Sequence, residues 1–514
     1  MNESVNIAAV DTNSVSREER VFTKTDKIMS AVSTVLAFLF IEFAVIRTTG
    51  FVTTAVYVAL ITFSIVFMRK KGCKFTKYNV LMAAVLYLFA FVFSLTDSGF
   101  IKFLDSVFLF FAGAYFVYSA AEGKTQMERY LPFAMLKALF EFPFSHFGTQ
   151  ALVTKECVKT PGTAAGLRNL LLGLIMAFPL TFIVGILLVS ADAGMENFFT
   201  ELVFSSAFYR LFNYGVHFMI ALPCSLYLFG LVYSNSSRKG LRLLDHELCR
   251  KITDSVKFIP NSIGYTAVTP ICILYIMFFI SQASYFLSAF SGSLPSGYSY
   301  SEYARRGFFE LVFVAVINLT VICLMSLFSK KGGSEKPKAL KFYNITLSVF
   351  TLILITVAMS KMVMYISISG LTRLRLYTSW FMLLCAAIFI LIIIKQFRFN
   401  FRFTGWCTGI FTVMFAVLCF GHPDWAIAKY NIEMYNAGYL EDLDTGYLVE
   451  MSDDAVLTAL ESGVLSNNEV YSYTRRRSSD NMRNLNIPSL ILRSALSKYD
   501  VKELTYPDFK LPKY

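Results

Sequence analysis

Long apolar runs recur along this 514-residue chain, and they decide its fold class. About 20 apolar residues are needed for a helix to cross the roughly 30 Å hydrocarbon core of a bilayer. Only 16% of the residues are charged and the mean hydropathy is +0.56, which argues against a soluble globular domain. We therefore predict an all-α, polytopic transmembrane helical bundle with about eleven spans. The predicted spans are 28–46, 51–68, 78–95, 101–121, 169–191, 213–233, 264–287, 307–328, 342–360, 377–394 and 404–421.

The distribution of basic residues predicts the orientation of these spans. With the N-terminus in the cytoplasm, the inner segments hold 29 Lys and Arg residues and the outer boundaries hold eight. Cytoplasmic loops carry this excess in membrane proteins, so the net charge of +12 indicates membrane topology rather than nucleic-acid binding. An odd number of spans then places the C-terminus outside the cytoplasm. We expect a multi-pass protein of the cell (plasma) membrane with the lipid bilayer as its partner.

Composition divides the chain into three segments. Residues 1–26 mix both charge signs with Ser, Thr and Asn, which predicts a flexible cytoplasmic tail. Residues 27–421 form the transmembrane bundle. Residues 422–514 carry fourteen acidic and ten basic residues, which predicts a small, soluble, helical, extracytoplasmic domain.

Two helix starts stand out in that last segment. Asp424 is placed to cap a helix that continues to Asn436. A second helix is expected to start at Ser452, with Asp453 and Asp454 in its first turn, where carboxylates suit the helix dipole.

The stretch 298–310, YSYSEYARRGFFE, marks a polar site at a membrane boundary, because it opens the apolar run 307–328. Glu302, Arg306 and Glu310 follow at i, i+4 and i+8, which aligns opposite charges along one helical stripe. Arg305 lies about 100° away on a helix. We predict that Arg305 reaches the C-terminal segment or the boundary at 361–376.

Charged residues on the outer side form a candidate cluster. Basic residues are disfavoured there, so acidic side chains at the same depth must compensate for them. We favour a network of ion pairs that clamps helix ends to the C-terminal segment. The alternative is a polar pocket for an anionic or lipid-headgroup ligand. The cluster consists of Asp192, Glu302, Arg305, Arg306, Glu310, Arg373, Arg375 and Asp424.

Glu42 is an isolated acid within the first predicted span. Ionisable groups inside a membrane are costly and usually face the bundle interior. We expect Glu42 to face the bundle and to meet a polar or basic partner.

Catalytic, cofactor and metal signatures are missing from the sequence. It has no Walker A, dinucleotide-binding, zincin or nucleophile-elbow motif. The nine cysteines and four histidines are scattered singly, without ligand spacing. We expect neither an enzyme nor a metal or cofactor protein.

Several motifs resemble one bacterial integral-membrane family. They are SerAlaAspAla at 190–193, SerTyrSerGluTyrAlaArgArgGlyPhePheGluLeu at 299–311, GlyLeuThrArgLeuArg at 370–375, AspTrpAlaIleAlaLysTyrAsn at 424–431 and TyrLeuValGluMetSerAspAspAlaVal at 447–456. The family is catalogued as domain of unknown function number 4173, related to number 4153. The chain departs from its pattern at Leu457, where the family has proline. The resemblance implies a multi-pass membrane protein and no established activity, substrate or cofactor.

Two classes of function stay open. The first is a non-enzymatic envelope sensor or partner subunit, whose outer segment binds a signal or a membrane or envelope protein. The second is a transporter of a small anionic or lipid-like substrate, suggested by Pro179, Pro223 and Pro270 in three consecutive spans and by Glu42 and Glu310. The ligand itself is not predicted.

Overall fold

The computed structural model of the chain describes residues 22–47, 50–157, 206–237, 246–257, 260–291, 308–329, 337–398, 400–466, 468–470 and 485–496, with isolated positions within 173–188 and at 473. Within these residues the protein is helical and has no strand. Ten helical segments in this part of the chain are long and apolar enough to cross a membrane. The predicted all-α, polytopic helical bundle is therefore confirmed.

These ten segments correspond to ten of the eleven predicted spans. The remaining prediction, 169–191, lies outside the described residues except at isolated positions. Several helices are longer than predicted, and α16 is one example, because it covers Lys338–Ser369 instead of 342–360. It continues past the apolar run at both ends and stops at Gly370, whose φ of +73° leaves the helical region.

The chain divides into two compact units. The first consists of Met1–Phe38 and Pro143–Tyr233, and the second of Leu39–Phe142 and Ser234–Tyr514. The segment after residue 421 is part of the second unit, and its division from the bundle as a domain stays a prediction.

In the first unit, the buried Gln150 joins three helices. Its amide nitrogen lies 3.0 Å from the Ser30 carbonyl oxygen and 2.7 Å from the Ser225 hydroxyl. Polar pairs of this kind hold membrane helices together without exposing polar atoms to lipid. The helices of this unit are most of α1 (Lys24–Phe40), the end of α7 (Phe142–Ser145), α8 (Thr149–Cys157) and most of α11 (Ser206–Ser237).

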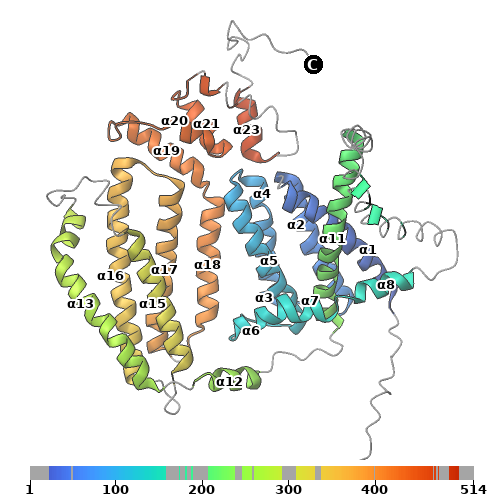
Figure 1. The fold of residues 1–514 in the computed structure, drawn as a ribbon, viewed down its shortest axis with the longest axis horizontal. Helices are drawn as coiled ribbons and strands as arrows, with labels where there is room; N and C mark the ends of the chain where they lie inside the picture. Colours follow the sequence, from blue (N-terminus) through green and yellow to red (C-terminus); the bar gives the residue numbers. More distant parts are fainter. Residues whose placement is uncertain are drawn as a thin grey trace, which may run out of the picture. The chain divides into compact units, whose positions relative to one another are not determined.

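In the second unit, aromatic side chains pack α3 and α5 against α18. The rings of Phe89 and Phe415 are stacked with centroids 5.5 Å apart, and Phe108 lies 5.4 Å from Phe415. The first helices of this unit are η1 (Ile41–Ile46), α2 (Gly50–Lys70), α3 (Lys77–Ala90), α4 (Val92–Leu95), α5 (Gly99–Glu122), α6 (Leu131–Leu136) and η2 (Lys137–Glu141). Figure 1 labels α2 to α6 among them.

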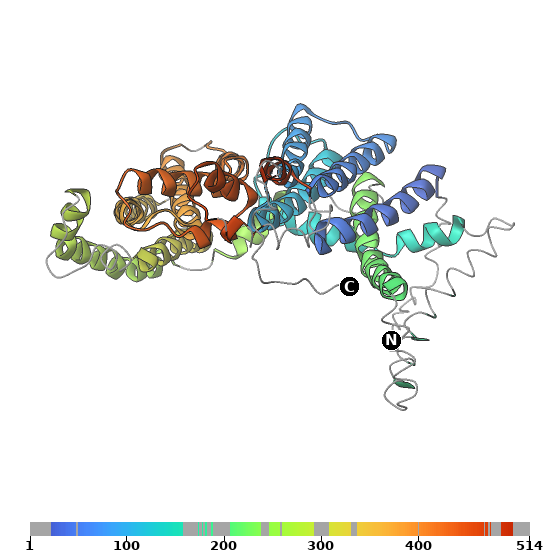
Figure 2. The ribbon, with the colours of Figure 1, turned by 90° about the horizontal axis from the view of Figure 1, so that it is seen from above.

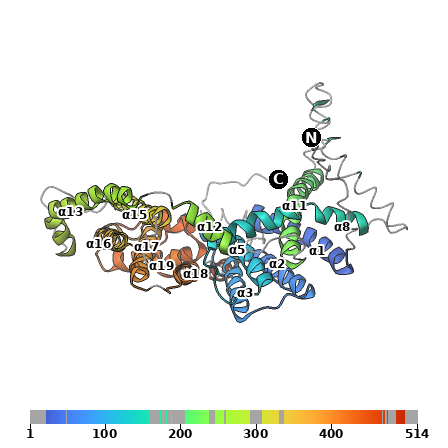
Figure 3. The ribbon, with the colours of Figure 1, turned by 90° about the horizontal axis from the view of Figure 1, so that it is seen from below.

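The later helices of the second unit are α12 (His246–Ser255), α13 (Asn261–Ser291), α15 (Phe308–Phe328), α16, α17 (Arg373–Phe397) and α18 (Phe403–Phe420). A polar triplet joins α13, α15 and α16: Asn318 donates a hydrogen bond to Thr351 (2.8 Å) and accepts one from Tyr275 (2.6 Å). Figure 3 shows α15, α16 and α17 next to one another, seen from below.

The C-terminal segment, defined here as residues 423–496, forms a small helical layer at one end of α16, α17 and α18 (Figures 1 and 2). Its apolar core includes Ile427, Leu448 and Ala455, all fully buried. Leu371 and Leu376, from the turn after α16 and from α17, pack against the same core. Its helices are α19 (Pro423–Asn436), α20 (Thr445–Glu450), α21 (Asp453–Glu461) and α23 (Ile487–Leu496).

One predicted helix start was right and the other was wrong. Ser452 precedes α21, with Asp453 and Asp454 in its first turn. Asp424, however, does not cap α19. The helix already begins at Pro423, a residue suited to the first helical position because it lacks an N–H group, and Asp424 lies in the first turn.

Candidate functional site: the contact of the C-terminal segment with the bundle

Arg373 and Asp424 form a two-point ion pair between α17 and α19. Arg373 Nε donates to Asp424 Oδ1 at 2.9 Å, and its Nη2 donates to Oδ2 at 2.6 Å. The backbone N–H of Ser452 also donates to Asp424 Oδ2, at 3.3 Å. The Asp424 side chain is only 2% exposed, so this carboxylate is buried among donors. Bidentate arginine–carboxylate pairs combine charge with fixed geometry, which suits a clamp.

The turn between α16 and α17 is held by a side-chain amide from α19. Asn431 Oδ1 accepts from the Leu371 N–H at 2.6 Å, and Asn431 Nδ2 donates to the Leu371 carbonyl at 2.8 Å. Gly370 permits this approach, because a β-carbon there would lie 2.9 Å from Asn431 Oδ1. The Arg373 N–H adds a hydrogen bond to the Tyr447 hydroxyl at 3.0 Å. Both backbone and side chains of 370–373 therefore bind the C-terminal segment.

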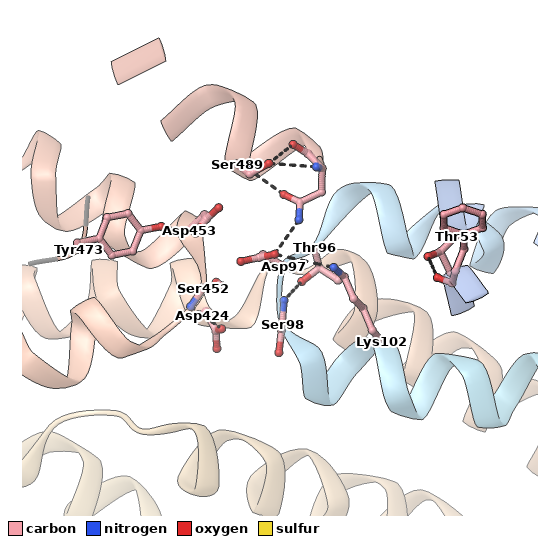
Figure 4. Close-up of polar contacts among 12 residues, drawn as sticks. Thr53, Thr96, Asp97, Ser98, Lys102, Asp424, Ser452, Asp453, Tyr473 and Ser489 are labelled. Carbon is pink, nitrogen blue, oxygen red and sulfur yellow. Dashed lines mark hydrogen bonds and ion pairs between the residues drawn. The ribbon is translucent and has the colours of Figure 1, made fainter. Parts of the chain in front are cut away.

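A second anchor involves the start of α23 (Figure 4). Asn486 and Ser489 exchange capping hydrogen bonds: Asn486 Oδ1 accepts from the Ser489 N–H, and Ser489 Oγ accepts from the Asn486 N–H. Asn486 Nδ2 also donates to Asp97 Oδ1 at 2.7 Å. Asp97 precedes α5 and lies 3.8 Å from the ammonium of Lys102. The residue that caps α23 thus also binds the loop between α4 and α5.

A third anchor is made by the backbone. The Phe51 N–H donates to the Leu485 carbonyl at 3.0 Å. Gly50 makes room for this contact, since a β-carbon on it would overlap the Leu485 carbonyl oxygen. The C-terminal segment therefore contacts the chain at 50–51, at 97 and at 370–373, which begin or precede three different spans.

The two adjacent aspartates of α21 serve different partners. The Asp453 carboxylate accepts a hydrogen bond from the Tyr473 hydroxyl at 2.5 Å, inside the segment. Asp454 Oδ2 lies 2.9 Å from His422 Nδ1, at the junction of α18 and α19. The hydrogen bond to Asp454 raises the pKa of His422 above its ordinary value. The folded protein therefore favours the protonated form of His422 at this junction.

Of the eight residues in the predicted charged cluster, the structure describes four. Arg373 and Asp424 lie together, whereas Arg375 turns back to α16, where it donates to the Ser369 carbonyl and stacks 3.8 Å over the Tyr365 ring. Glu310 has an exposed side chain at the start of α15, within electrostatic range of Lys361. Four members lie outside the described residues, so their contacts stay predictions: Asp192, Glu302, Arg305 and Arg306.

Glu42 lies in η1, a short π-helix that ends the first span. Its side chain is 2% exposed, and Arg47 Nη2 lies 2.7 Å from its Oε1. Within the same π-helix, the Phe43 carbonyl accepts a hydrogen bond from the Thr53 hydroxyl of α2 at 2.7 Å. The structure thus places a basic partner beside Glu42 at the membrane boundary.

Comparison with known families decides the affiliation of the chain. The sequence profile described as "Domain of unknown function (DUF4153)" matches residues 81–462. The chain belongs to the DUF4153 family. Membership of number 4173, the related family suggested by the motifs, stays a prediction. No curated protein and no solved structure matches the chain.

In this DUF4153 protein the matched region contains α5, the turn at 370–373, α19 and α21, and so most of the contacts described above. Among the described residues, no group of three or more His, Cys, Asp or Glu side chains could hold a metal ion. What the site offers is a set of hydrogen bonds and one buried ion pair that join the segment to the bundle.

Sequence reasoning missed three residues of this contact. Asn431 ends the motif at 424–431, but nothing in the sequence marked its side chain as a partner of Leu371. Asp97 and Asn486 are single polar residues outside any motif. A weak signal existed for Asp97, because an acid next to a predicted span needs a partner. Nothing in the sequence indicated that this partner would be 389 residues away.

Proposed function

We propose that this protein is a non-enzymatic envelope sensor or partner subunit whose C-terminal segment binds an extracytoplasmic partner or signal. The observation that supports the proposal is the set of anchors from this segment to 50–51, 97 and 370–373. Each anchor lies at the start of a different span. A force or displacement at the segment therefore acts on several membrane helices together, as a signal-transmitting contact requires.

Exposed aromatic residues on the segment support a partner-binding role. Tyr439 is 70% exposed and Trp425 is 43% exposed. Aromatic residues are enriched at protein interfaces and often dominate their binding energy.

Photo-crosslinking in native membranes tests this function. We would place a photoreactive amino acid at Tyr439 and, as a matched control, at Phe397, which is 74% exposed at the far end of α17. The proposal predicts a discrete protein adduct at position 439 that is missing at position 397. Equal or absent adducts at both positions would contradict it.

Transport of a small anionic or lipid-like substrate is the second candidate. Pro223 lies inside α11 and Pro270 inside α13, and Glu42 is buried at the membrane boundary. Prolines and buried charges recur in the broken helices of transporters. Uptake of inorganic phosphate or of a fluorescent phospholipid by vesicles containing the purified protein would favour this function. If the vesicles show no uptake and a specific adduct forms at Tyr439, the results would favour the sensor or partner-subunit function over transport.

A further inference from the structure

Asp105 differs from the other buried acids of the described chain. It lies in α5, one turn after Lys102, and its side chain is completely buried. Neither carboxylate oxygen has a hydrogen-bond partner. By contrast, Glu42 has Arg47 and Asp424 has Arg373. Asp105 is thus an acidic side chain inside a membrane-spanning helix. Among the described residues, no group compensates a negative charge on it.

The surroundings of Asp105 are aromatic. Phe108 lies one turn further along the same face of α5, 4.4 Å from Phe89 of α3 and 5.4 Å from Phe415 of α18 by ring centroids. On the α2 side, Tyr57 stacks on Phe93 at 4.9 Å. This packing joins α2, α3, α4, α5 and α18 near the carboxyl group, which has no exposed surface of its own.

Titratable groups near Asp105 do not supply a counter-charge. Tyr57 of α2 and Cys419 of α18 are close enough to Asp105 to interact with it electrostatically. Neither side chain can carry a positive charge. Lys102, on α5 itself, lies 3.8 Å from Asp97. No contact joins Lys102 to the Asp105 carboxylate among the described residues.

The charged and titratable side chains of the other elements packed on α5 have other partners or are exposed. In η2, Lys137 and Glu141 pair with each other at 3.3 Å. In α3, Lys77 is exposed and the Tyr78 hydroxyl bonds to Met127, whereas Tyr87 bonds to Thr62. The short helices α4 and α6 contain no titratable side chain.

An unpaired carboxylate in such a site costs far more free energy than a carboxylic acid, because nothing replaces its hydration. We propose that Asp105 is an intramembrane proton-binding site, which holds a proton while α2, α5 and α18 are packed together. Release transfers this proton to a water molecule, and water can reach the carboxyl only if the packing opens. Proton release and opening of this part of the bundle are therefore coupled.

Infrared spectroscopy of the full-length protein in lipid tests the proposal directly. A protonated carboxyl has a carbonyl band separate from that of a carboxylate, and labelling aspartate with carbon-13 shifts the band and identifies it. At neutral pH we expect one such aspartic-acid band, which disappears in Asp105→Asn. The control Asp442→Asn removes an exposed aspartate of the C-terminal segment, and it should leave the band unchanged.

Two outcomes overturn the proposal: a wild-type spectrum without an aspartic-acid band at neutral pH, or a band that Asp105→Asn does not remove. Asp105→Asn should also keep the thermal stability of the wild type, because asparagine resembles the neutral acid in shape and charge. If that variant does not fold, Asp105→Glu decides the question. The labelled aspartic band must then be lost and an unlabelled glutamic-acid band must appear, and persistence of the aspartic band contradicts the proposal.

Discussion

Arg373 on α17 and Asp424 on α19 meet through two parallel hydrogen bonds of 2.9 and 2.6 Å. The arginine side chain is 34% exposed and the aspartate 2%, so the acid is buried and the base reaches it from the edge of the site. The pair joins the first residue of α17, a helix long and apolar enough to cross a membrane, to the first turn of α19. It is the buried ion pair of the contact on which the proposed function rests.

Removing either partner of this pair should destabilise the protein. Arg373→Ala leaves the buried Asp424 carboxylate without its charge partner, and we expect a loss of about 3 kcal/mol, the lower end of the range for a broken buried pair. Arg373→Lys should restore only part of it, because an ammonium cannot reproduce the two-point geometry. Thermal unfolding in detergent measures both effects. Unchanged unfolding temperatures for Arg373→Ala and Asp424→Asn would contradict the clamp.

The amide of Asn431 should control the mobility of the turn after α16. Asn431→Asp keeps an acceptor for the Leu371 N–H but places a carboxylate oxygen against the Leu371 carbonyl, where an N–H now donates. We expect faster hydrogen exchange of the Leu371 amide and a destabilisation of about 1–3 kcal/mol. Asn436→Asp, at an exposed position of the same helix, is the matched control. Equal exchange in the two variants would argue against the amide clamp.

Stability near neutral pH should depend on His422. Its pKa is raised in the folded protein by Asp454, so the protonated form is favoured by folding. The added stability is present below the pKa of the unfolded chain, about 6.5, and is lost as the pH rises through the higher folded value. Because His422 is 38% exposed, we expect at most about 1 kcal/mol. His422→Gln should remove this part of the pH dependence, and an identical profile for wild type and variant would count against it.

Gly50 should be needed for docking of residues 485–486. Gly50→Ala adds a methyl group that overlaps the Leu485 carbonyl, and overpacking of this kind costs about 1–3 kcal/mol. Gly99→Ala is the matched control, because it also begins a span and nothing lies within 4 Å of its added carbon. We expect faster proteolysis of the C-terminal segment in Gly50→Ala alone. The same protease resistance in both variants would show that the close approach at Gly50 does not matter.

Much of the bundle could be predicted from apolar runs, because a bilayer imposes a minimum helix length on them. The π-helix at Ile41–Ile46 could not, since its residues are as apolar as those of the preceding α-helix. The end of α16 was also missed, because hydropathy falls after residue 360 while the helix continues to Ser369.

The sequence pointed to Arg373 and Asp424 through a conflict with the positive-inside rule, but it could not pair them. Pairing depends on packing between α17 and α19, which charge patterns do not encode. Arg375 shows what charge patterns cannot predict. It belongs to the same motif as Arg373, and yet its side chain donates to a carbonyl of α16. Asp105 lies within the predicted span 101–121, but only the packed helices show that its carboxylate has no hydrogen-bond partner among the described residues.

Disulfide trapping tests most directly whether the C-terminal segment is docked on the bundle. We would introduce Asp97→Cys and Asn486→Cys, two positions 389 residues apart that are joined by a 2.7 Å hydrogen bond, into a chain whose nine native cysteines are replaced by alanine. Mild oxidation in membranes should produce a disulfide between positions 97 and 486 and none between 97 and a cysteine at the exposed Asn436. The docked arrangement is contradicted if no 97–486 disulfide forms while both thiols react freely with a maleimide.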